Sequence, residues 1–194
     1  MEREISKLSQ TDKKPSLLLH ACCAPCSSSV LERVVPYFTV TLFYYNPNIW
    51  PLDEFEKRAA EFPKLLSALE IDKDVSLIIP PYDEKAYYDA VSGLECEPEG
   101  GERCTKCFDV RLRKTAQTAG ENGFDYFCTT LSVSPHKDAE RINEIGISLE
   151  KAYGIKWLPA DFKKKNGYLR SVELCEKFGI YRQNYCGCKF AACV

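Results

Sequence analysis

Seven of the chain's eleven cysteines stand in close groups, and this grouping constrains the protein more than any other feature of the sequence. Burying seven unpaired thiols at turns and element ends has no packing rationale, so the groups favour a metal centre. Two isolated cysteines, Cys128 in a predicted strand and Cys175 in a predicted amphipathic helix, are expected to be small buried side chains. The three groups are Cys22, Cys23 and Cys26; Cys104 and Cys107; and Cys186 and Cys188.

The N-terminal residues carry scattered charges and no apolar core of the kind that a signal peptide needs. No apolar run approaches the roughly 18 residues required to span a membrane, and the longest is interrupted at His20. The sequence therefore predicts a cytoplasmic protein without a membrane partner, and we expect a monomer. In a reducing cytosol, grouped cysteines more often bind metal or do redox chemistry than form disulfides.

Strand and helix patterns alternate along the whole chain, which predicts an α/β fold with a parallel sheet and helices on both faces. The expected topology is Rossmann-like (adenine-nucleotide-hydrolase-like), in a single domain over residues 16–194 that follows an N-terminal extension of residues 1–15. Strands are expected at 16–21, 38–45, 75–79, 124–130 and 155–158, and helices at 27–35, 52–70 with a kink near Pro63, 84–91, 104–119, 138–153 and 168–178.

Ligands of open α/β sheets bind beyond the carboxyl ends of the strands, and three unusual segments are expected there. CCAPC follows the first predicted strand, TTLSVSPHK ends the fourth, and PADFKKKNGY follows the fifth. If the sheet is parallel, all three meet at one edge. We expect His20, inside the first strand, to be a buried and hydrogen-bonded core residue, and His136, in the SPHK loop, to be exposed and able to contact a substrate.

Cys104 and Cys107 form a CxxC motif at the start of a predicted helix, where free backbone N–H groups favour thiolates. Soft thiolate sets suit zinc or iron–sulfur clusters. An all-thiolate zinc site would use four of the grouped cysteines and leave three unexplained. A cubane cluster with four thiolates leaves three cysteines and nearby carboxylates such as Asp161 for a second metal or a reactive thiol.

The first cysteine group admits another interpretation, because Cys23 and Cys26 form the CxPC motif of thioredoxin-like thiol–disulfide oxidoreductases. Against it, a third cysteine directly precedes the motif, and the pattern lacks the antiparallel strands that such proteins have after the central helix. A cysteine-rich zinc-binding domain also stays open as an alternative. ATP binding is disfavoured, since cysteines occupy the loop that would cradle phosphate.

The net charge of −2 provides no global field to hold nucleic acid, but the segment from residue 156 onward has eight basic and three acidic residues. A local charge of +5 can face a phosphate backbone, and interleaved tyrosines can stack on unpaired bases. For the lysine run alone, a solvated face is the competing interpretation. The candidates are Lys163, Lys164, Lys165, Arg170 and Arg182 for phosphate, and Tyr168, Tyr181 and Tyr185 for stacking.

Taken together, five segments resemble the cobalamin-independent epoxyqueuosine reductase family, QueH: HACCAPCSS, YNPNIWPLDEFEKR, GGERCTKCFDVRLRKTA, TTLSVSPHKD and ADFKKKNGYLRSVELCEKFGIYRQNYCGC. The resemblance runs from about Leu17 to Cys188. It implies an oxidoreductase that performs the last step of queuosine biosynthesis, in which epoxyqueuosine in a tRNA anticodon loop loses its epoxide oxygen by a reduction with two electrons and two protons.

The same resemblance implies a [4Fe–4S] cluster with an additional mononuclear iron beside it, and an electron donor of unspecified identity. On this basis we predict that the seven grouped cysteines supply the metal ligands. Asp161 is predicted to be catalytic, either as a ligand of the second iron or as a proton donor. The tRNA anticodon loop would lie against the basic segment.

Overall fold

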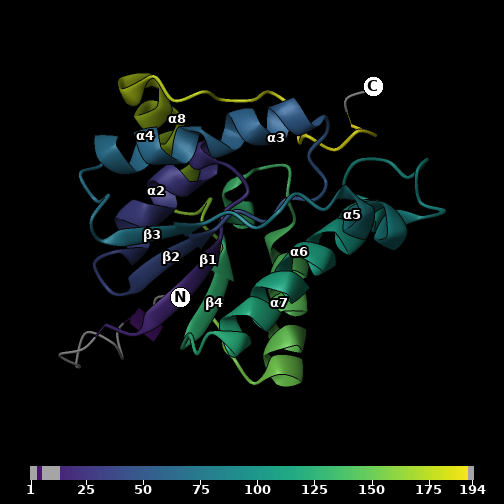
Figure 1. The fold of residues 1–194 in the computed structure, drawn as a ribbon, viewed down its shortest axis with the longest axis horizontal. Helices are drawn as coiled ribbons and strands as arrows, with labels where there is room; N and C mark the ends of the chain where they lie inside the picture. The colour runs from purple at the N-terminus through teal and green to yellow at the C-terminus, as the bar shows by residue number, and fades with distance from the viewer. Residues whose placement is uncertain (1–3, 6–13, 192–194) are drawn as a thin grey trace.

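The computed structural model describes residues 4–5 and 14–191 and has a five-stranded sheet at its centre (Figure 1). The strand order is β3-β2-β1-β4-β5, and all paired strands are parallel. This is the order of a doubly wound sheet, whose order reverses next to β1, so the predicted α/β fold is confirmed. The strands are β1 (Ser16–His20), β2 (Thr39–Phe43), β3 (Val75–Ile78), β4 (Tyr126–Thr129) and β5 (Lys156–Trp157).

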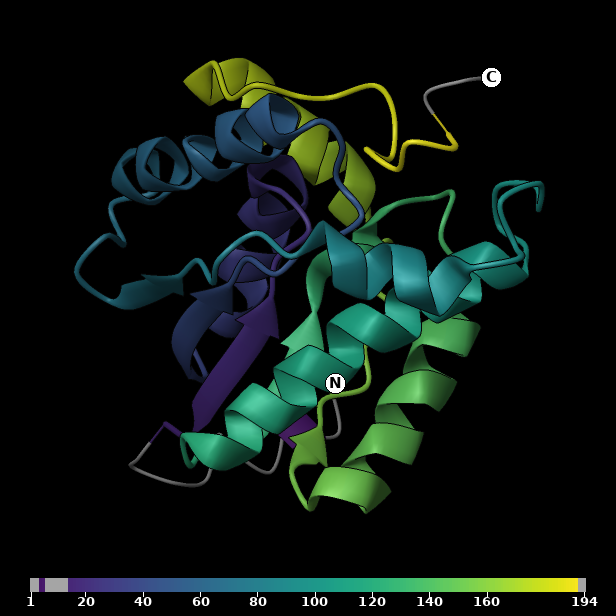
Figure 2. The same cartoon turned by 45° about the vertical axis from the view of Figure 1, so that its right-hand side comes forward.

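Helices cover both faces of the sheet, as Figures 1 and 2 show from two directions. One face carries α2 (Ala24–Val34), α3 (Leu52–Ala59), α4 (Glu61–Ala68) and α8 (Gly167–Phe178). The other carries α6 (Glu102–Glu121) and α7 (Ala139–Tyr153), with α5 (Glu84–Val91) packed on α6 and a 3₁₀ turn, η1 (Thr130–Val133), after β4. Among the described helices, none combines the length and apolar character needed to cross a membrane.

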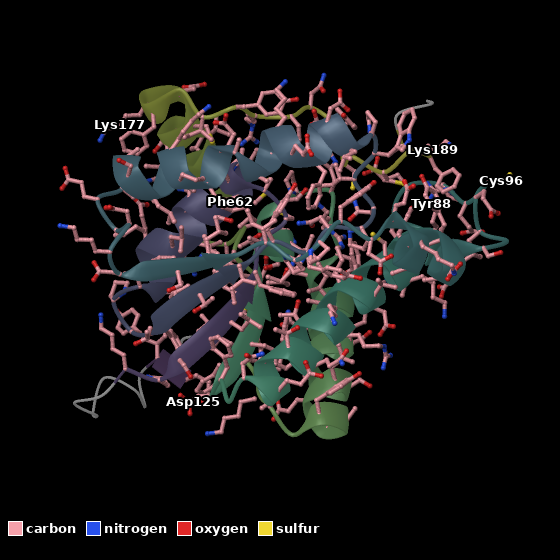
Figure 3. The ribbon with its side chains drawn as sticks, in the orientation of Figure 1. Phe62, Tyr88, Cys96, Asp125, Lys177 and Lys189 are labelled. Atoms are coloured by element: carbon pink, nitrogen blue, oxygen red, sulfur yellow. The ribbon has the colours of Figure 1, made fainter. Side chains whose placement is uncertain are left out.

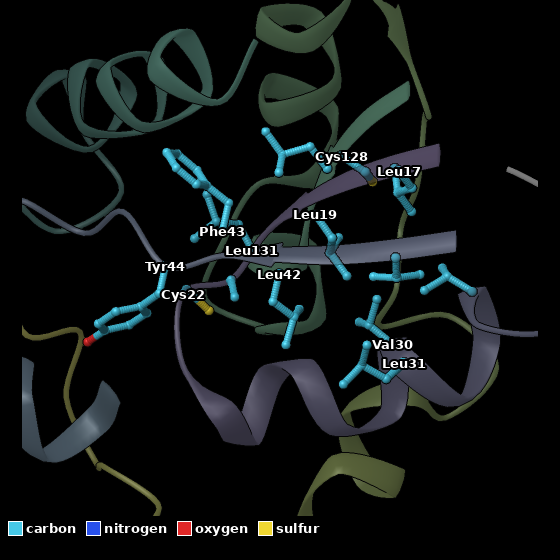
Figure 4. Packing of buried hydrophobic residues seen from close by; sticks show 14 of the residues in the cluster. Leu17, Leu19, Cys22, Val30, Leu31, Leu42, Phe43, Tyr44, Cys128 and Leu131 are labelled. Atoms are coloured by element: carbon cyan, nitrogen blue, oxygen red, sulfur yellow. The ribbon is translucent and has the colours of Figure 1, made fainter. Parts of the chain in front are cut away.

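The core forms around β1, whose three consecutive leucines are fully buried. A continuous apolar run is typical of a central parallel strand, because helices cover both of its faces. Figure 4 shows Leu19 and Leu42 of the sheet together with Val30 and Leu31 of α2. Burying one such side chain contributes about 1.5–3 kcal/mol. Cys128 and Cys175 are also buried, as expected from the sequence.

Two predicted boundaries are wrong, and both involve a proline. Helix α2 begins at Ala24 rather than at residue 27, with Pro25 in its first turn and Cys23 as the extended N-cap residue. The 52–70 segment breaks at Ala60 rather than at Pro63, so that Pro63 also lies in a first turn. A proline is tolerated there, because the N–H that it lacks would have no partner within the helix.

Candidate metal centre and substrate cavity

Cys22, Cys23 and Cys26 form a compact group of sulfurs where the chain leaves β1 and enters α2. Figure 4 shows Cys22 at this place. Their sulfur atoms lie within 4.8 Å of one another, with 3.8 Å between those of Cys22 and Cys23. In the described part of the chain, no other three histidine, cysteine or acidic side chains gather as closely. Two thiolates on one tetrahedral ion at about 2.3 Å are roughly 3.8 Å apart, so this group can hold a metal ion.

The environment of this group concentrates negative charge on one thiol. Hydrogen bonds from Cys23 and Cys26 lower the pKa of Cys22, and the hydrogen bond shared with Cys22 raises the pKa of Cys23 to about 12. Thr130, directly after β4, accepts a hydrogen bond from the Cys22 N–H at 3.1 Å and donates its hydroxyl to Cys22 Sγ at 3.4 Å. The neighbouring strands β1 and β4 therefore deliver their loops to one point, as the predicted parallel sheet requires.

The other four grouped cysteines line the smaller of two adjoining cavities, which has a volume of about 90 Å³. Cys104 and Cys107 come from the first turns of α6, while Cys186 and Cys188 come from the C-terminal segment. Burial raises the pKa of Cys107 to about 12, and the hydroxyl of Tyr87 lies 2.9 Å from Cys188 Sγ. The ten cysteines of the described residues are all free thiols, so these four remain available as ligands.

The CGC segment (residues 186–188) is fastened to Trp50, just before α3, and to Arg58 in the last turn of α3. The Trp50 N–H donates to the Gly187 carbonyl at 2.8 Å, and Arg58 Nη1 donates to the Cys186 carbonyl at 3.1 Å. Gly187 has φ +96°, and a Cβ there would lie 2.8 Å from Arg58 Nη1. Arg58 is itself held by Glu54, with 2.7 Å between Nε and Oε1. Glycine is therefore required between the two cysteines, both for its conformation and for the close approach of Arg58.

A larger cavity of about 980 Å³ adjoins the first cysteine group and the C-terminal pair, because Cys22, Cys26 and Cys186 line it. Cys186 lines the smaller cavity as well, so the two cavities are neighbours. Several polar atoms of its lining are buried and have no hydrogen-bond partner in the described chain. Native proteins satisfy most buried polar groups, so such atoms indicate a polar ligand. These atoms are Asn48 Oδ1, Arg58 Nη2, Arg111 Nη2 and Gln183 Oε1.

The two histidines lie where the sequence indicated. His20 is fully buried, with Nδ1 2.8 Å from Thr129 Oγ1 and Nε2 3.0 Å from the Tyr45 carbonyl. Burial lowers its pKa to about 3, so it is a neutral core residue, as expected. His136 is exposed and lines both cavities. Its contact with a substrate stays a prediction.

The structure places Asp161 beside two lysines. Its carboxylate oxygens are 3.4 Å from Lys163 Nζ and 3.8 Å from Lys164 Nζ, and the residue is not among those that line either cavity. Asp161 closely precedes a run of three lysines, which attract its carboxylate. The sequence alone does not show which of the lysines it contacts. The catalytic role of Asp161 stays a prediction.

Among the three candidate stacking tyrosines, Tyr168 and Tyr185 line the larger cavity and Tyr181 does not. The Tyr181 ring lies under Lys57, with Nζ 3.5 Å from its centroid, and its hydroxyl lies 3.3 Å from Glu54 Oε1. These contacts explain its place outside the cavity. Tyr168 and Tyr185 are therefore the better placed of the three to meet an unpaired base.

The candidate phosphate-binding residues differ in where they lie and in which side chains they contact. Arg182 is exposed at the larger cavity, with its guanidinium 5.1 Å from the centre of the Tyr168 ring. Arg170 instead forms ion pairs with Glu32 at 2.7 Å and Glu173 at 3.2 Å. Of the lysine run, Lys163 donates to the Lys137 carbonyl, while Lys164 and Lys165 are exposed.

Sequence reasoning missed the polar lining of the larger cavity. Asn48 belongs to the turn after β2, and Gln183 belongs to the segment before the last cysteine pair. The turn could have been recognised, because asparagines directly after a strand of a parallel sheet lie at its ligand-binding edge. Arg58 and Arg111 carry no comparable signal, since each reads as an ordinary charged residue of an amphipathic helix.

Comparison with known proteins agrees with this arrangement, whereas the all-parallel sheet does not fit the thioredoxin-like alternative. A family model described as "Epoxyqueuosine reductase QueH" matches residues 17–193. A protein of that name from Streptococcus pyogenes serotype M1 is 49% identical over 92% of this chain and 71% of its own length. Proteins of the same name from Staphylococcus epidermidis (40% identical; 99% and 82%) and Thermotoga maritima (37%; 91% and 90%) also match. The chain therefore belongs to the epoxyqueuosine reductase QueH family.

Proposed function

We propose that this protein reduces epoxyqueuosine to queuosine in the anticodon loop of tRNA. In the overall reaction, the epoxide, two electrons and two protons give an alkene and one molecule of water. The observation that carries the proposal is that six of the seven grouped cysteines line two adjoining cavities, with Cys23 directly beside Cys22 and Cys26, in a member of this family. The reaction consumes two electrons, which a redox-active metal centre held by these cysteines would supply.

The donor set fits the proposed [4Fe–4S] cluster and additional iron, because soft thiolates suit iron and the described cysteines are free. The seven grouped cysteines are the proposed ligands. When bound, the metal centre would supply electrons and a Lewis acid for the departing oxygen. Tyr87 and Thr130 would hold the ligands in place, since their hydroxyls lie 2.9 Å from Cys188 Sγ and 3.4 Å from Cys22 Sγ.

The polar groups of the larger cavity would orient the modified base. The unpartnered oxygens of Asn48 and Gln183 would accept N–H groups of a guanine-like base, and Tyr168 and Tyr185 would stack on unpaired bases of the loop. His136 is exposed and lines both cavities, where it would contact the substrate. To reach the cavity, Asp161 would have to break its contacts with Lys163 and Lys164. If an Asp161→Asn variant keeps full activity, another group donates the proton.

The proposed reaction is tested by incubating anaerobically purified, iron-loaded protein with a reductant and tRNA that carries epoxyqueuosine. The modified nucleoside is expected to lose the mass of one oxygen atom, as measured by mass spectrometry after digestion of the tRNA. The protein should be brown and contain iron with acid-labile sulfide. An unchanged nucleoside mass at full iron loading would overturn the proposed reaction, and a colourless protein with zinc alone would favour the zinc-binding alternative.

We further propose that the basic segment beside the cavity holds the tRNA backbone, because the protein as a whole is slightly acidic. Replacing Lys163, Lys164 and Lys165 by alanine should flatten the dependence of log affinity on log salt. Each phosphate contact on a single strand contributes roughly 0.7 to that slope, so three contacts would remove about 2. Filter binding or fluorescence anisotropy over a salt series measures the change.

The matched control for this lysine experiment replaces three exposed lysines elsewhere, Lys64, Lys73 and Lys85, none of which lines the cavity. The control changes the net charge by the same amount, so any difference between the two triple variants comes from position. Equal slopes for both variants would show that the 163–165 run is only a solvated face. Iron loading should stay intact in both.

A further inference from the structure

Basic side chains gather around the cysteines of this slightly acidic protein. Two acidic residues, Glu99 and Asp138, are the complete acidic lining of the two cavities among the described residues. The excess of positive charge at the sulfurs indicates a resident negative charge, because like charges do not collect in a partly buried site without compensation. The basic lining residues are Arg58, Arg103, Arg111, Lys137, Arg141 and Arg182.

Arg111 of α6 lines both cavities and therefore shares a wall with cysteines of all three groups. Its Nε donates to the Cys107 carbonyl at 3.1 Å and its Nη1 donates to Asn46 Oδ1 at 3.4 Å, while Nη2 has no partner in the described chain. Burial alone would lower the pKa of Arg111, yet the thiolate forms of Cys107, Cys186 and Cys22 would raise it. The guanidinium therefore interacts electrostatically with cysteines of all three groups.

Arg111 is also a buried cation without a carboxylate partner. Its side chain is only 2% exposed, and no carboxylate of the described residues lies within 4.0 Å of it. Arg58, equally buried, is paired with Glu54 at 2.7 Å. Burying an unpaired charge costs several kcal/mol, so an anionic group in the cavities that Arg111 lines would compensate its charge.

Lys137 supplies a second positive charge from another part of the chain. It belongs to the loop between η1 and α7 and lines both cavities. Burial would lower the pKa of Lys137, but negative charge on Cys186, Cys22 and Cys26 raises it. The Lys163 ammonium donates to the Lys137 carbonyl at 3.1 Å and fastens this loop. Two cations from separate elements therefore act on the same thiols.

We propose that Arg111 and Lys137 are positioning residues that hold positive charge against a thiolate-bound metal centre and raise its reduction potential. The inference rests on the proposed function only in requiring that the cysteines bind a redox-active metal. Gaining an electron makes such a centre more negative, so nearby cations stabilise its reduced form. Arg111 Nη2 has no partner in the described chain and would be available to donate a hydrogen bond to a thiolate ligand, and such bonds act in the same direction.

The test measures the midpoint potential of the metal centre by spectroelectrochemical titration in Arg111→Gln, Arg111→Lys and Lys137→Gln, compared at equal iron and sulfide content. Both glutamine variants should have a lower potential than the parent protein, and R111K should lie between R111Q and the parent, because it keeps the charge. The matched control is Arg113→Gln, which removes an exposed arginine from the same helix that pairs with Asp109 at 3.0 Å. Its potential should be unchanged.

A merely structural role for Arg111 predicts a different pattern. R111K and R111Q would then lose metal equally, since both lack the hydrogen bonds to Cys107 and Asn46, and K137Q would keep the parent potential. That result, or equal potentials in all fully loaded variants, would overturn the proposal. If R111Q fails to load, the loop variant K137Q decides alone. No tRNA is needed, so this outcome is separate from the test of the reaction.

Discussion

Replacing Cys104 or Cys107 by serine should abolish both iron binding and reduction of epoxyqueuosine. Both thiols lie on the first turns of α6 and line the smaller cavity with the CGC pair. A serine hydroxyl has a similar size but is a poor ligand for iron in a thiolate set. The loss should exceed the roughly 10–100-fold that substitutions next to a metal ligand cost. Iron and acid-labile sulfide per chain, visible absorption and turnover of modified tRNA measure it.

The controls for this prediction are two cysteines outside the groups. Cys96 is exposed at the outer edge of the molecule, as Figure 3 shows, and Cys175 is buried in α8. Cys96→Ser should leave iron content and activity unchanged, and Cys175→Ala should affect only stability. A C104S/C107S double variant that still reduced a disulfide through Cys23 and Cys26 would contradict the metal assignment and restore thiol–disulfide chemistry.

The sequence predicted best those elements whose ends are determined by neighbouring residues, such as helix caps. The predicted helix at 84–91 agrees with α5, whose N-cap Asp83 accepts a hydrogen bond from the Ala86 N–H. Helix α7 likewise begins after Asp138, which caps two N–H groups, and ends at Gly154 in a left-handed conformation. Capping acids and C-terminal glycines act over three or four residues, so a sequence window contains the whole signal.

The meeting of the cysteine groups was only partly predictable. A parallel sheet brings the loops after β1 and β4 to one edge, which explains why Cys22 lies beside Thr130. The sheet does not determine where the C-terminal segment runs. That path depends on contacts such as Arg58 with the Cys186 carbonyl, which joins residues 128 positions apart. Such pairings are set by tertiary packing and leave no local pattern.

Tertiary contacts also explain why the sequence could not show which basic residues of the segment from residue 156 onward can bind a partner. Its residues have similar chemistry in the sequence, yet Arg170 is held by Glu32, 138 positions away, while Arg182 lies at the cavity. A charge count measures the potential available to a partner, whereas ion pairs within the fold decide which side chains can use it. For this reason, a tRNA surface is better sought around Arg182, which lines the cavity, than across the whole segment.

Replacing Gly167 by alanine should be the most destabilising single methyl addition at this end of the molecule. A Cβ at Gly167 would lie 1.9 Å from the Phe162 carbonyl oxygen and 3.1 Å from its carbon. Both are backbone atoms, so no rotamer change relieves the contact. The loop cannot simply move away, because Phe162 N–H donates to Ser132 Oγ at 3.2 Å and Lys163 N–H donates to the Ser132 carbonyl at 3.1 Å.

The expected loss for Gly167→Ala is about 3 kcal/mol or more of the free energy of unfolding, at the upper end of the range for overpacking, measured by urea denaturation. Gly179→Ala is the control, because its φ of +61° strains an alanine but no atom lies within 4 Å of the added Cβ. Strain of that kind costs roughly 1–2 kcal/mol. Since Gly167 also starts the helix that places Tyr168 at the larger cavity, tRNA affinity should fall with stability in G167A and hold in G179A. If G167A is as stable as G179A, the backbone at the start of α8 can shift at little cost in free energy. In that case the loop after β5 does not hold α8 in its place beside the cavity.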